Sequence, residues 1–215
     1  MNIDRIYAML GRRFRTPRMR ALVAEFGIDD RIRVLDVGGT PFNWELVDVR
    51  PQITLLNHAS LTEGTELPAH VSFTVGDGRA LGFEDGEFDV VVSNSVIEHV
   101  GDYQDQSTFA SEVRRVGRGL WVQAPARGFF LEPHYLAPFV HWLPRRVQRL
   151  IIRWLTPRGW IERPNQETVD EMVDEIRLPT RREMQQWFPD CEMRAERVLG
   201  MTKSHIAVRP YRATR

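Results

Sequence analysis

Residue types that bind ligands recur where apolar segments of this 215-residue chain end. The run RIRVLDV at 31–37 contains Asp36 and is followed at once by Gly38 and Gly39. A carboxylate can hold a cation or accept hydrogen bonds from the amine and hydroxyl groups of a nucleoside, and glycines let a ligand approach the backbone. Each such end alone could be a tight strand–helix turn. Similar residues end four later runs: Asn57-His58, Gly76-Asp77-Gly78, Asn94-Ser95 and Gln123-Ala124-Pro125.

These side chains can share one site only if the apolar runs are parallel strands of one sheet. The run at 88–94 is continuously apolar, which is typical of a strand buried on both faces. A helix is predicted over 107–117, and another over 17–26 with Pro17 at its first position. Strands that alternate with helices imply right-handed crossovers and a parallel sheet, whose carboxyl ends meet at one edge.

The fold class predicted is α/β: a Rossmann-like, doubly wound, mostly parallel seven-stranded sheet with a C-terminal antiparallel hairpin and an inserted helical lid. The hairpin comes from the runs at 191–200 and 203–210, after a helix capped by Thr180. One domain is expected, with four parts. They are N-terminal helices at 1–29, a core at 30–125 that carries the binding residues, the lid at 126–178, and a terminal helix and hairpin at 179–215.

The lid contributes a second group of reactive side chains. Glu132, His134 and Tyr135 lie within four residues, and His141 follows. They could line a substrate pocket, or the segment could be an arm packed on the sheet through its aromatic residues. Glutamate and histidine also bind divalent ions, but no fixed ligand spacing is present, so the sequence predicts no metal site.

Residues 144–155, PRRVQRLIIRWL, predict a basic amphipathic helix. Such a helix can bury its apolar face in its own domain and leave arginines in solvent. It can also rest on an anionic membrane, bind a phosphorylated or lipid-linked substrate, or contact another subunit.

Composition narrows the function classes. The formal net charge is zero, which disfavours a dedicated nucleic-acid binder. A single cysteine excludes an internal disulfide and a cysteine-based zinc site, which favours a reducing compartment. No apolar run approaches the ~20 residues of a membrane span, and the N-terminus lacks the features of a signal peptide. A cytoplasmic protein, at most peripheral to a membrane, is expected.

Three segments in order, VLDVGG, VGDGRAL and FDVVVSNSVIEHV, resemble motifs of the class I S-adenosylmethionine-dependent methyltransferases, of the small-molecule type. The resemblance covers about residues 30–125, and VLGMTKSHIAVRP is similar to the terminal hairpin of that family. It implies S-adenosyl-L-methionine as cofactor. It also implies that Asp36, Gly38, Gly39 and Thr40 hold the methionine part, that Asp77, Gly78 and Arg79 hold the adenine, and that Asn94 and Ser95 lie under the sulfonium.

The chain departs from the family pattern at two places. Thr40 and Phe42 replace the later glycines of the first loop, and Asn57 stands where the family usually has an acidic residue for the ribose. An amide lacks the charge-assisted strength of a carboxylate, so weaker or differently shaped cofactor binding is expected. Alternatively, Asn57 only fixes a turn.

Methyl transfer needs little protein machinery, because the sulfonium is already activated and the acceptor must only be aligned and lose its proton. His99, His134 and Glu132 are the candidate catalytic residues. His99 could be a general base near neutral pH or a polar residue hydrogen-bonded to a cap. Glu98 is expected to be an acid at a helix N-terminus.

The predicted function is methyl transfer to a small-molecule or lipid-linked acceptor, at oxygen. The altered loop and Asn57 keep open a non-catalytic relative that serves as a binding or scaffold subunit. An NAD-linked enzyme is disfavoured because GGTPFN does not supply G-x-G-x-x-G. No nucleic-acid partner is expected, and the sequence does not constrain the oligomeric state.

Overall fold

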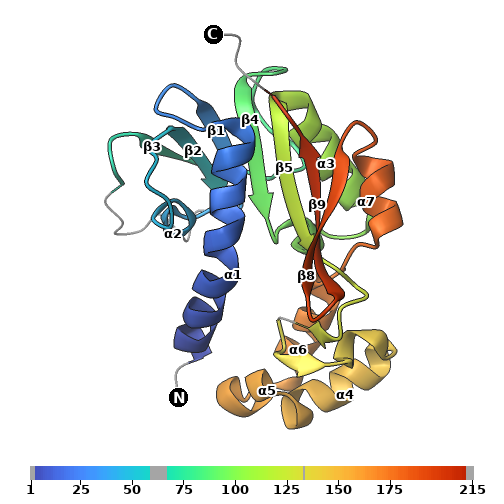
Figure 1. The fold of residues 1–215 in the computed structure, drawn as a ribbon. Coiled ribbons are helices and arrows are strands. Elements are labelled where there is room, and N and C mark those ends of the chain that lie inside the picture. The colour runs from blue at the N-terminus through green and yellow to red at the C-terminus, as the bar shows by residue number, and fades with distance from the viewer. Residues whose placement is uncertain (1–2, 59–66, 133, 212–215) are drawn as a thin grey trace.

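The computed structural model describes residues 3–58, 67–132 and 134–211, with side chains from residue 12 onward. Its main feature is one seven-stranded sheet in the order β3-β2-β1-β4-β5-β9-β8 (Figure 1). The first five strands are parallel, and β9 joins β5 and β8 in antiparallel register. The predicted fold class is therefore confirmed. The strands are β1 (Arg33–Val37), β2 (Gln52–Asn57), β3 (Val71–Val75), β4 (Phe88–Asn94), β5 (Gly117–Pro125), β8 (Glu192–Val198) and β9 (Met201–Arg209).

Helices cover both faces of the sheet, because the strand residues are apolar on both sides. One face packs against α1 (Ile3–Phe26) and the short α2 (Pro41–Trp44), through side chains such as Leu22, Phe26 and Trp44. The other packs against α3 (Tyr103–Val116) and α7 (Arg181–Trp187), through side chains such as Phe109 and Val113. A separate apolar core on each face of the sheet thus fixes β1 and β4 and the loops that follow them.

Three predicted boundaries were wrong. The first helix begins at Ile3, so the N-terminal helices expected at 1–29 are one helix that contains Pro17. Proline removes one backbone hydrogen bond there without ending the helix. Helix α3 begins at Tyr103 because Asp102 caps it and Asp105 closes a capping box. The hairpin turns at Leu199 and Gly200, both with positive φ, two residues earlier than the gap between the predicted runs at 191–200 and 203–210.

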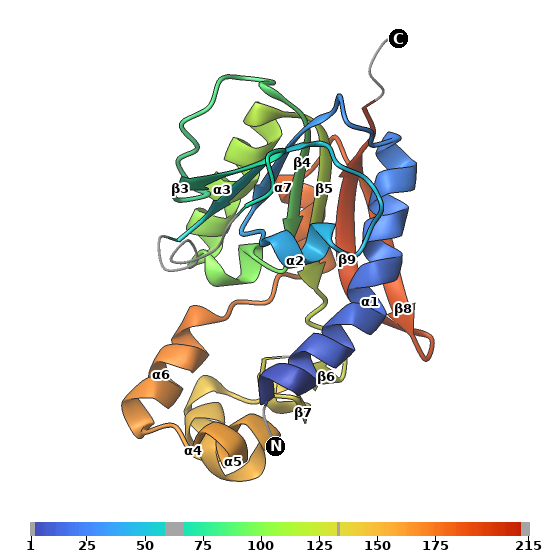
Figure 2. The same ribbon diagram turned by 90° about the vertical axis from the view of Figure 1, so that its left-hand side faces the viewer.

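The inserted segment forms a cap with its own core at the carboxyl edge of the sheet (Figures 1 and 2). Its buried residues include Tyr135, Val140, Ile152 and Val173. The N-terminal end of α1 extends to the level of the cap in both views. The cap elements are β6 (Leu131–Glu132), β7 (Ala137–Pro138), η3 (Val140–Trp142), α4 (Arg145–Leu155), α5 (Pro157–Glu162) and α6 (Gln166–Glu175).

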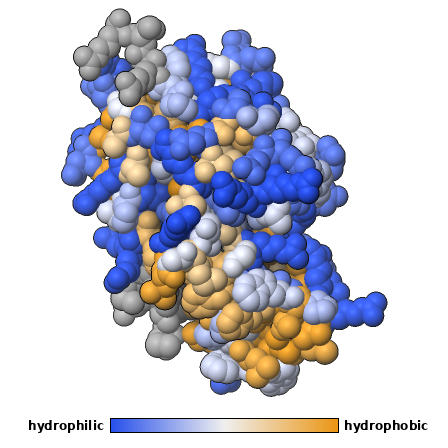
Figure 3. All heavy atoms as spheres, turned by 45° about the vertical axis from the view of Figure 1, so that its right-hand side comes forward, coloured by the Kyte–Doolittle hydropathy of each residue, from blue (hydrophilic) through white to orange (hydrophobic). Residues whose placement is uncertain are grey.

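Helix α4 does not bury the apolar face predicted for it. Ile152 is fully buried, but Leu150 is 70% exposed and both Trp154 and Leu155 are 65% exposed. Trp160 of α5 is also exposed. Apolar side chains gather over the lower end of the molecule in Figure 3. Of the alternatives left open for this helix, full burial of its apolar side in its own domain does not hold, since α4 contacts the cap core mainly through Ile152 and Ile151. None of the described helices is long and apolar enough to cross a membrane.

Candidate active site

The loop after β1 needs glycine at two positions. Gly38 has φ +74° and donates its amide to the Leu56 carbonyl at 2.7 Å. A Cβ there would lie 2.3 Å from Val96, and a Cβ on Gly39 would lie 2.1 Å from the Asp36 carboxyl carbon. The loop therefore folds back onto Asp36. A side chain at Gly38 would push the loop away from Val96, and one at Gly39 would push it away from Asp36.

Asp36 is a buried carboxyl with one satisfied oxygen. Its side chain accepts a hydrogen bond from Trp44 Nε1 at 2.9 Å through Oδ2, while Oδ1 has no partner within the described chain. Burial raises the pKa of Asp36 to about 7, against the opposing effects of the Trp44 hydrogen bond and the Arg15 charge. An orphaned buried oxygen of this kind is available to a ligand donor.

The glycine-poor part of the loop forms α2. Thr40 is the N-cap residue with extended backbone and no side-chain cap hydrogen bond, and Pro41 occupies the first helical position. Phe42 packs under the guanidinium groups of Arg12 and Arg15, at 5.5 and 5.8 Å. A helical turn in place of further glycines explains the departure from the family pattern.

Asn57, at the end of β2, fixes the same loop. Its Nδ2 donates to the Gly39 carbonyl at 3.1 Å, and its Oδ1 accepts from the His58 amide at 2.8 Å. This arrangement agrees with the interpretation that Asn57 holds a turn. A carboxylate could not make the first of these bonds, because it has no donor.

Asp77 lies after β3 and is paired within the chain. The Arg79 guanidinium holds it at 2.6 Å and also reaches Asp105 at 2.8 Å. The hydrogen bond from Arg79 lowers the pKa of Asp77. Gly78 packs so closely that a Cβ would lie 2.6 Å from the Phe109 ring. The loop after β3 is therefore also closed by its own contacts.

The end of β4 has different surroundings. Both side-chain atoms of Asn94 are buried and have no hydrogen-bond partner among the described residues. Ser95 has φ +57°, and its Oγ donates to Gln123 Oε1 at 3.0 Å. Gln123 is held in turn by Arg18 at 2.7 Å. Asn94 and Ser95 thus lie together, and Asn94 carries unused hydrogen-bonding capacity.

The three candidate catalytic residues are brought together across the boundary between core and cap. His99, in η2 (Ile97–His99), lies with Nε2 at 3.1 Å from Nε2 of His134. His134 Nδ1 contacts Glu132 Oε1 at 2.6 Å, and His99 Nδ1 lies 3.2 Å from Glu175 Oε1. The result is a row in the order Glu132, His134, His99, Glu175. Nothing in the sequence pointed to Glu175.

Two imidazole nitrogens at 3.1 Å require a proton or a cation between them, because their lone pairs repel. Burial and the charge of His134 lower the pKa of His99. For His134, burial acts in the same direction, but the hydrogen bond and charge of Glu132 outweigh it and raise the pKa. Without a bound ion, the proton between the rings therefore belongs to His134.

Glu98, expected at a helix N-terminus, lies in the first turn of the short η2 and is completely buried beside this row. Neither of its carboxyl oxygens has a hydrogen-bond partner in the described parts of the chain. Its own carbonyl accepts from the Arg177 amide at 2.8 Å, which fixes the backbone. Burial raises the pKa of Glu98 to about 7.

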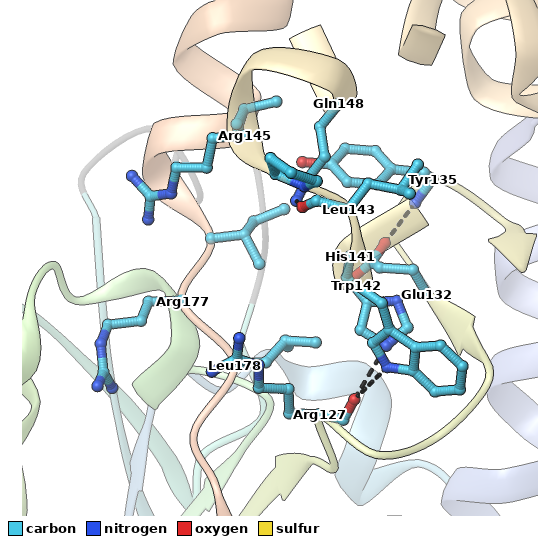
Figure 4. Close-up of a pocket in the computed structure, with 13 residues that line it drawn as sticks. Arg127, Glu132, Tyr135, His141, Trp142, Leu143, Arg145, Gln148, Arg177 and Leu178 are labelled. Carbon is cyan, nitrogen blue, oxygen red and sulfur yellow. Dashed lines mark hydrogen bonds between the residues drawn. The ribbon is translucent and has the colours of Figure 1, made fainter. Parts of the chain in front are cut away.

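A cleft of about 500 Å³ opens on the cap side of this row, which is within the usual range for small-molecule sites (Figure 4). Glu132 and Tyr135 line one wall, and Arg145 and Arg177 lie across from them. His141 and Trp142 bond to the Arg127 carbonyl at 3.0 and 2.8 Å, so His141 is separate from the histidine pair.

Residues 27–119 match the family model described as a methyltransferase domain. The fold is similar to magnesium protoporphyrin IX methyltransferase from Synechocystis PCC 6803 with bound SAH. That match has 12% identity, 97% coverage of this chain, 88% of the other and a TM-score of 0.59. A chain of the Haloferax volcanii complex that contains the Trm112 methyltransferase activator matches at 14% identity, 99% and 95% coverage and a TM-score of 0.58.

The match to the [4+2]-cyclase SpnF covers only 46% of that chain and 53% of this one, at 20% identity and a TM-score of 0.44. The family match lies on the segment that holds the loops after β1, β3 and β4. Together these findings agree with the resemblance to the class I S-adenosylmethionine-dependent methyltransferases: residues 27–119 match a methyltransferase-domain model, and the fold is similar to that of a solved methyltransferase.

Proposed function

We propose that this protein transfers a methyl group from S-adenosyl-L-methionine to the oxygen of a small molecule bound between core and cap. The observation that carries the proposal is the arrangement of one sheet edge. The closed glycine loop lies at the ends of the adjacent strands β1 and β4, together with an oxygen of Asp36 and the amide of Asn94 that have no hydrogen-bond partner among the described residues. The cofactor, when bound, supplies an electrophilic methyl group on its sulfonium.

The residues present fit that cofactor. Gly38 and Gly39 expose the backbone beside Asp36, and Thr40 continues the loop. This loop and the Asp36 carboxyl would hold the methionine part of the cofactor. Asp77, Gly78 and Arg79 would flank the adenine, and Asn94 and Ser95 would lie below the sulfonium. Asn57 would meet the ribose only through an amide already bonded to Gly39 and His58, so modest affinity is expected.

The acceptor is proposed to occupy the cleft of about 500 Å³. Glu132 lines this cleft and orients His134, which meets His99. These three residues would orient the acceptor hydroxyl, and the cluster that they form would take up its proton. Alignment and proton removal are all that methyl transfer to oxygen asks of the chain.

We further propose that the acceptor is lipid-linked or lies at a membrane surface. Leu150, Trp154, Leu155 and Trp160 form an exposed apolar face, and α4 also carries the exposed Arg146. Apolar and aromatic side chains beside arginines favour the surface of an anionic bilayer. The cap would then lie on the membrane with the cleft near the lipid head groups.

Calorimetry with S-adenosylhomocysteine tests the cofactor assignment. One equivalent should bind, and Gly39→Ala should weaken binding at least tenfold because its Cβ collides with Asp36. Gly82→Ala is the matched control, since a Cβ there meets nothing within 4 Å. Absence of binding by folded protein up to about 1 mM would contradict the proposal.

The second candidate is a binding or scaffold subunit that keeps the fold without turnover. It is favoured by one feature: Asn57 and Asp77, both assigned to the cofactor, are already bonded within the chain. Methyl transfer from labelled cofactor to any acceptor in an extract would exclude it. A chain that binds no cofactor but copurifies with a stable partner would support it.

A further inference from the structure

We propose that Glu98, His99 and His134 form a binding site for one divalent transition-metal ion at the boundary between core and cap. Within the described chain they are the one group of three or more histidine, cysteine or acidic side chains close enough to share an ion, with ligand atoms within 4.8 Å of one another. They come from η2 of the core and from the segment after β6 of the cap.

The separation of the two imidazoles suits coordination. Their Nε2 atoms lie 3.1 Å apart. Two nitrogens at about 2.1 Å from one ion would subtend an angle of about 95° at this separation, between octahedral and tetrahedral values. An ion would also replace the repulsion between facing lone pairs with two bonds.

Each ligand histidine has a carboxylate on its other nitrogen. Glu132 contacts Nδ1 of His134 at 2.6 Å, and Glu175 lies 3.2 Å from Nδ1 of His99. At His134 this is the usual support of a metal-bound histidine, because it places a proton on Nδ1 and leaves Nε2 for the ion, whereas Glu175 makes only a charge contact with His99. Glu132 also accepts from the Tyr135 amide at 2.8 Å, so its position is fixed by the cap backbone.

Glu98 is the independent sign that a cation belongs here. It is 0% exposed and neither oxygen has a hydrogen-bond partner in the parts of the chain that the structure describes. A buried ionised carboxylate without partners is strongly unfavourable, whereas the same carboxylate is stable as a metal ligand. Three carboxylates (Glu98, Glu132 and Glu175) surround two imidazoles, which leaves negative charge that a divalent ion would balance.

Two imidazoles and one carboxylate are the ligand set of zinc sites that keep a fourth position open, and they also suit cobalt, iron and manganese. Because His134 belongs to the cap and Glu98 and His99 to the core, the ion would also tie the cap to the sheet. If the proposed function holds, the open position would take the acceptor oxygen and favour loss of its proton.

Titration of the chelator-treated chain with Zn²⁺, without S-adenosylhomocysteine, tests the site. One equivalent should bind to the wild type, and Glu98→Gln and His134→Ala should each weaken binding at least about 100-fold. His141→Ala is the matched control, because this cap histidine lies outside the cluster, and it should keep wild-type affinity. Substitution with Co²⁺ should give visible absorption that is lost in the same two variants.

Folding is followed separately by thermal unfolding in chelator. Zn²⁺ should raise the melting temperature of the wild type and of His141→Ala, but not of Glu98→Gln. Equal Zn²⁺ affinity in all four proteins, or no binding by folded wild type, would overturn the site. Cofactor binding is a separate titration, so loss of the metal site and failure of the methyltransferase assignment give different results.

Discussion

The loops after β1, β2 and β3 differ from the cluster at the core–cap boundary in how their polar side chains are satisfied. Asn57 and Asp77 are bonded to neighbours within their own loops. Asn94 and Glu98 are buried with atoms that have no hydrogen-bond partner among the described residues. The comparison teaches that the loops after β1, β2 and β3 are largely preformed apart from Asp36, whereas the end of β4 and the boundary are incomplete without a ligand or ion, since buried polar groups are normally paired.

The largest effect on stability is expected from removing Arg18, which holds Gln123 next to the end of β4. Arg18 is buried, and it holds Glu196 through two bonds of 2.7 Å and Gln123 through a third. Arg18→Met should lower the free energy of unfolding by about 3 kcal/mol, because it removes the donor to Gln123 and leaves the partly buried Glu196 with Lys203, 3.7 Å away, as its remaining cationic contact. Denaturant unfolding measures this, with Arg31→Met, at an exposed ion pair, as a control that loses under about 1 kcal/mol.

The next effect concerns the buried carboxyl of Asp36, whose ionised form is unfavourable in the folded state. Asp36 has a folded pKa of about 7, above its unfolded value, so the folded state holds a proton that the unfolded chain has released. The stability contributed at this residue therefore falls as pH rises from about 4 to 7 and stays low above that range. Asp36→Asn should unfold at a higher temperature than the wild type, with the difference growing over this range.

The gain from Asp36→Asn is of the order of 2 kcal/mol at pH 8, with weaker binding of S-adenosylhomocysteine. Thermal unfolding at pH 4, 6 and 8 follows it, with Asp30→Asn, at an exposed position, as a control. A difference in melting temperature between variant and wild type that does not change with pH would show that the folded state does not raise the pKa of Asp36.

Restoring the carboxylate that the family usually has tests how closed the second loop is. Asn57→Asp loses the donor to the Gly39 carbonyl, so stability should fall by about 1 kcal/mol and cofactor affinity should not improve. Calorimetry with S-adenosylhomocysteine decides the matter. A several-fold gain in affinity would mean that residue 57 faces the ribose rather than the loop.

The smallest effect on stability belongs to the exposed face of the cap. Leu150→Gln should change the free energy of unfolding by less than about 0.5 kcal/mol, because the side chain is 70% exposed. It should nevertheless reduce cosedimentation with anionic vesicles several-fold. Val75→Gln, at an exposed residue of β3, is the control. Unchanged sedimentation would remove the membrane contact from the proposal.

Much of the sheet could be predicted from the sequence. The run at 88–94 is uninterrupted and forms β4 with the same bounds, and the run predicted to end at Asn57 forms β2, which ends at that residue. Such segments are predictable because their pattern is local. The start of α1 was missed because Pro17 has the same local signature at a helix start as inside a helix.

The candidate site was predictable only in part. His99, His134 and Glu132 were selected for residue type, but their contact spans an insertion and depends on how the cap docks. Glu175 and the burial of Glu98 depend on the same docking, so no sequence pattern revealed them. The sequence left several alternatives open for α4 for a related reason: its periodicity shows an apolar side but not what covers that side.

A crystal structure of the chain with S-adenosylhomocysteine tests the central claim most directly. The account predicts the ligand across Gly38 and Gly39, with its adenine beside Asp77, Gly78 and Arg79 and its sulfur toward Asn94. The cleft beside Glu132 should stay open for an acceptor. A ligand bound elsewhere, or a loop after β1 that excludes it while Asp36 stays bonded to Trp44, would contradict the account.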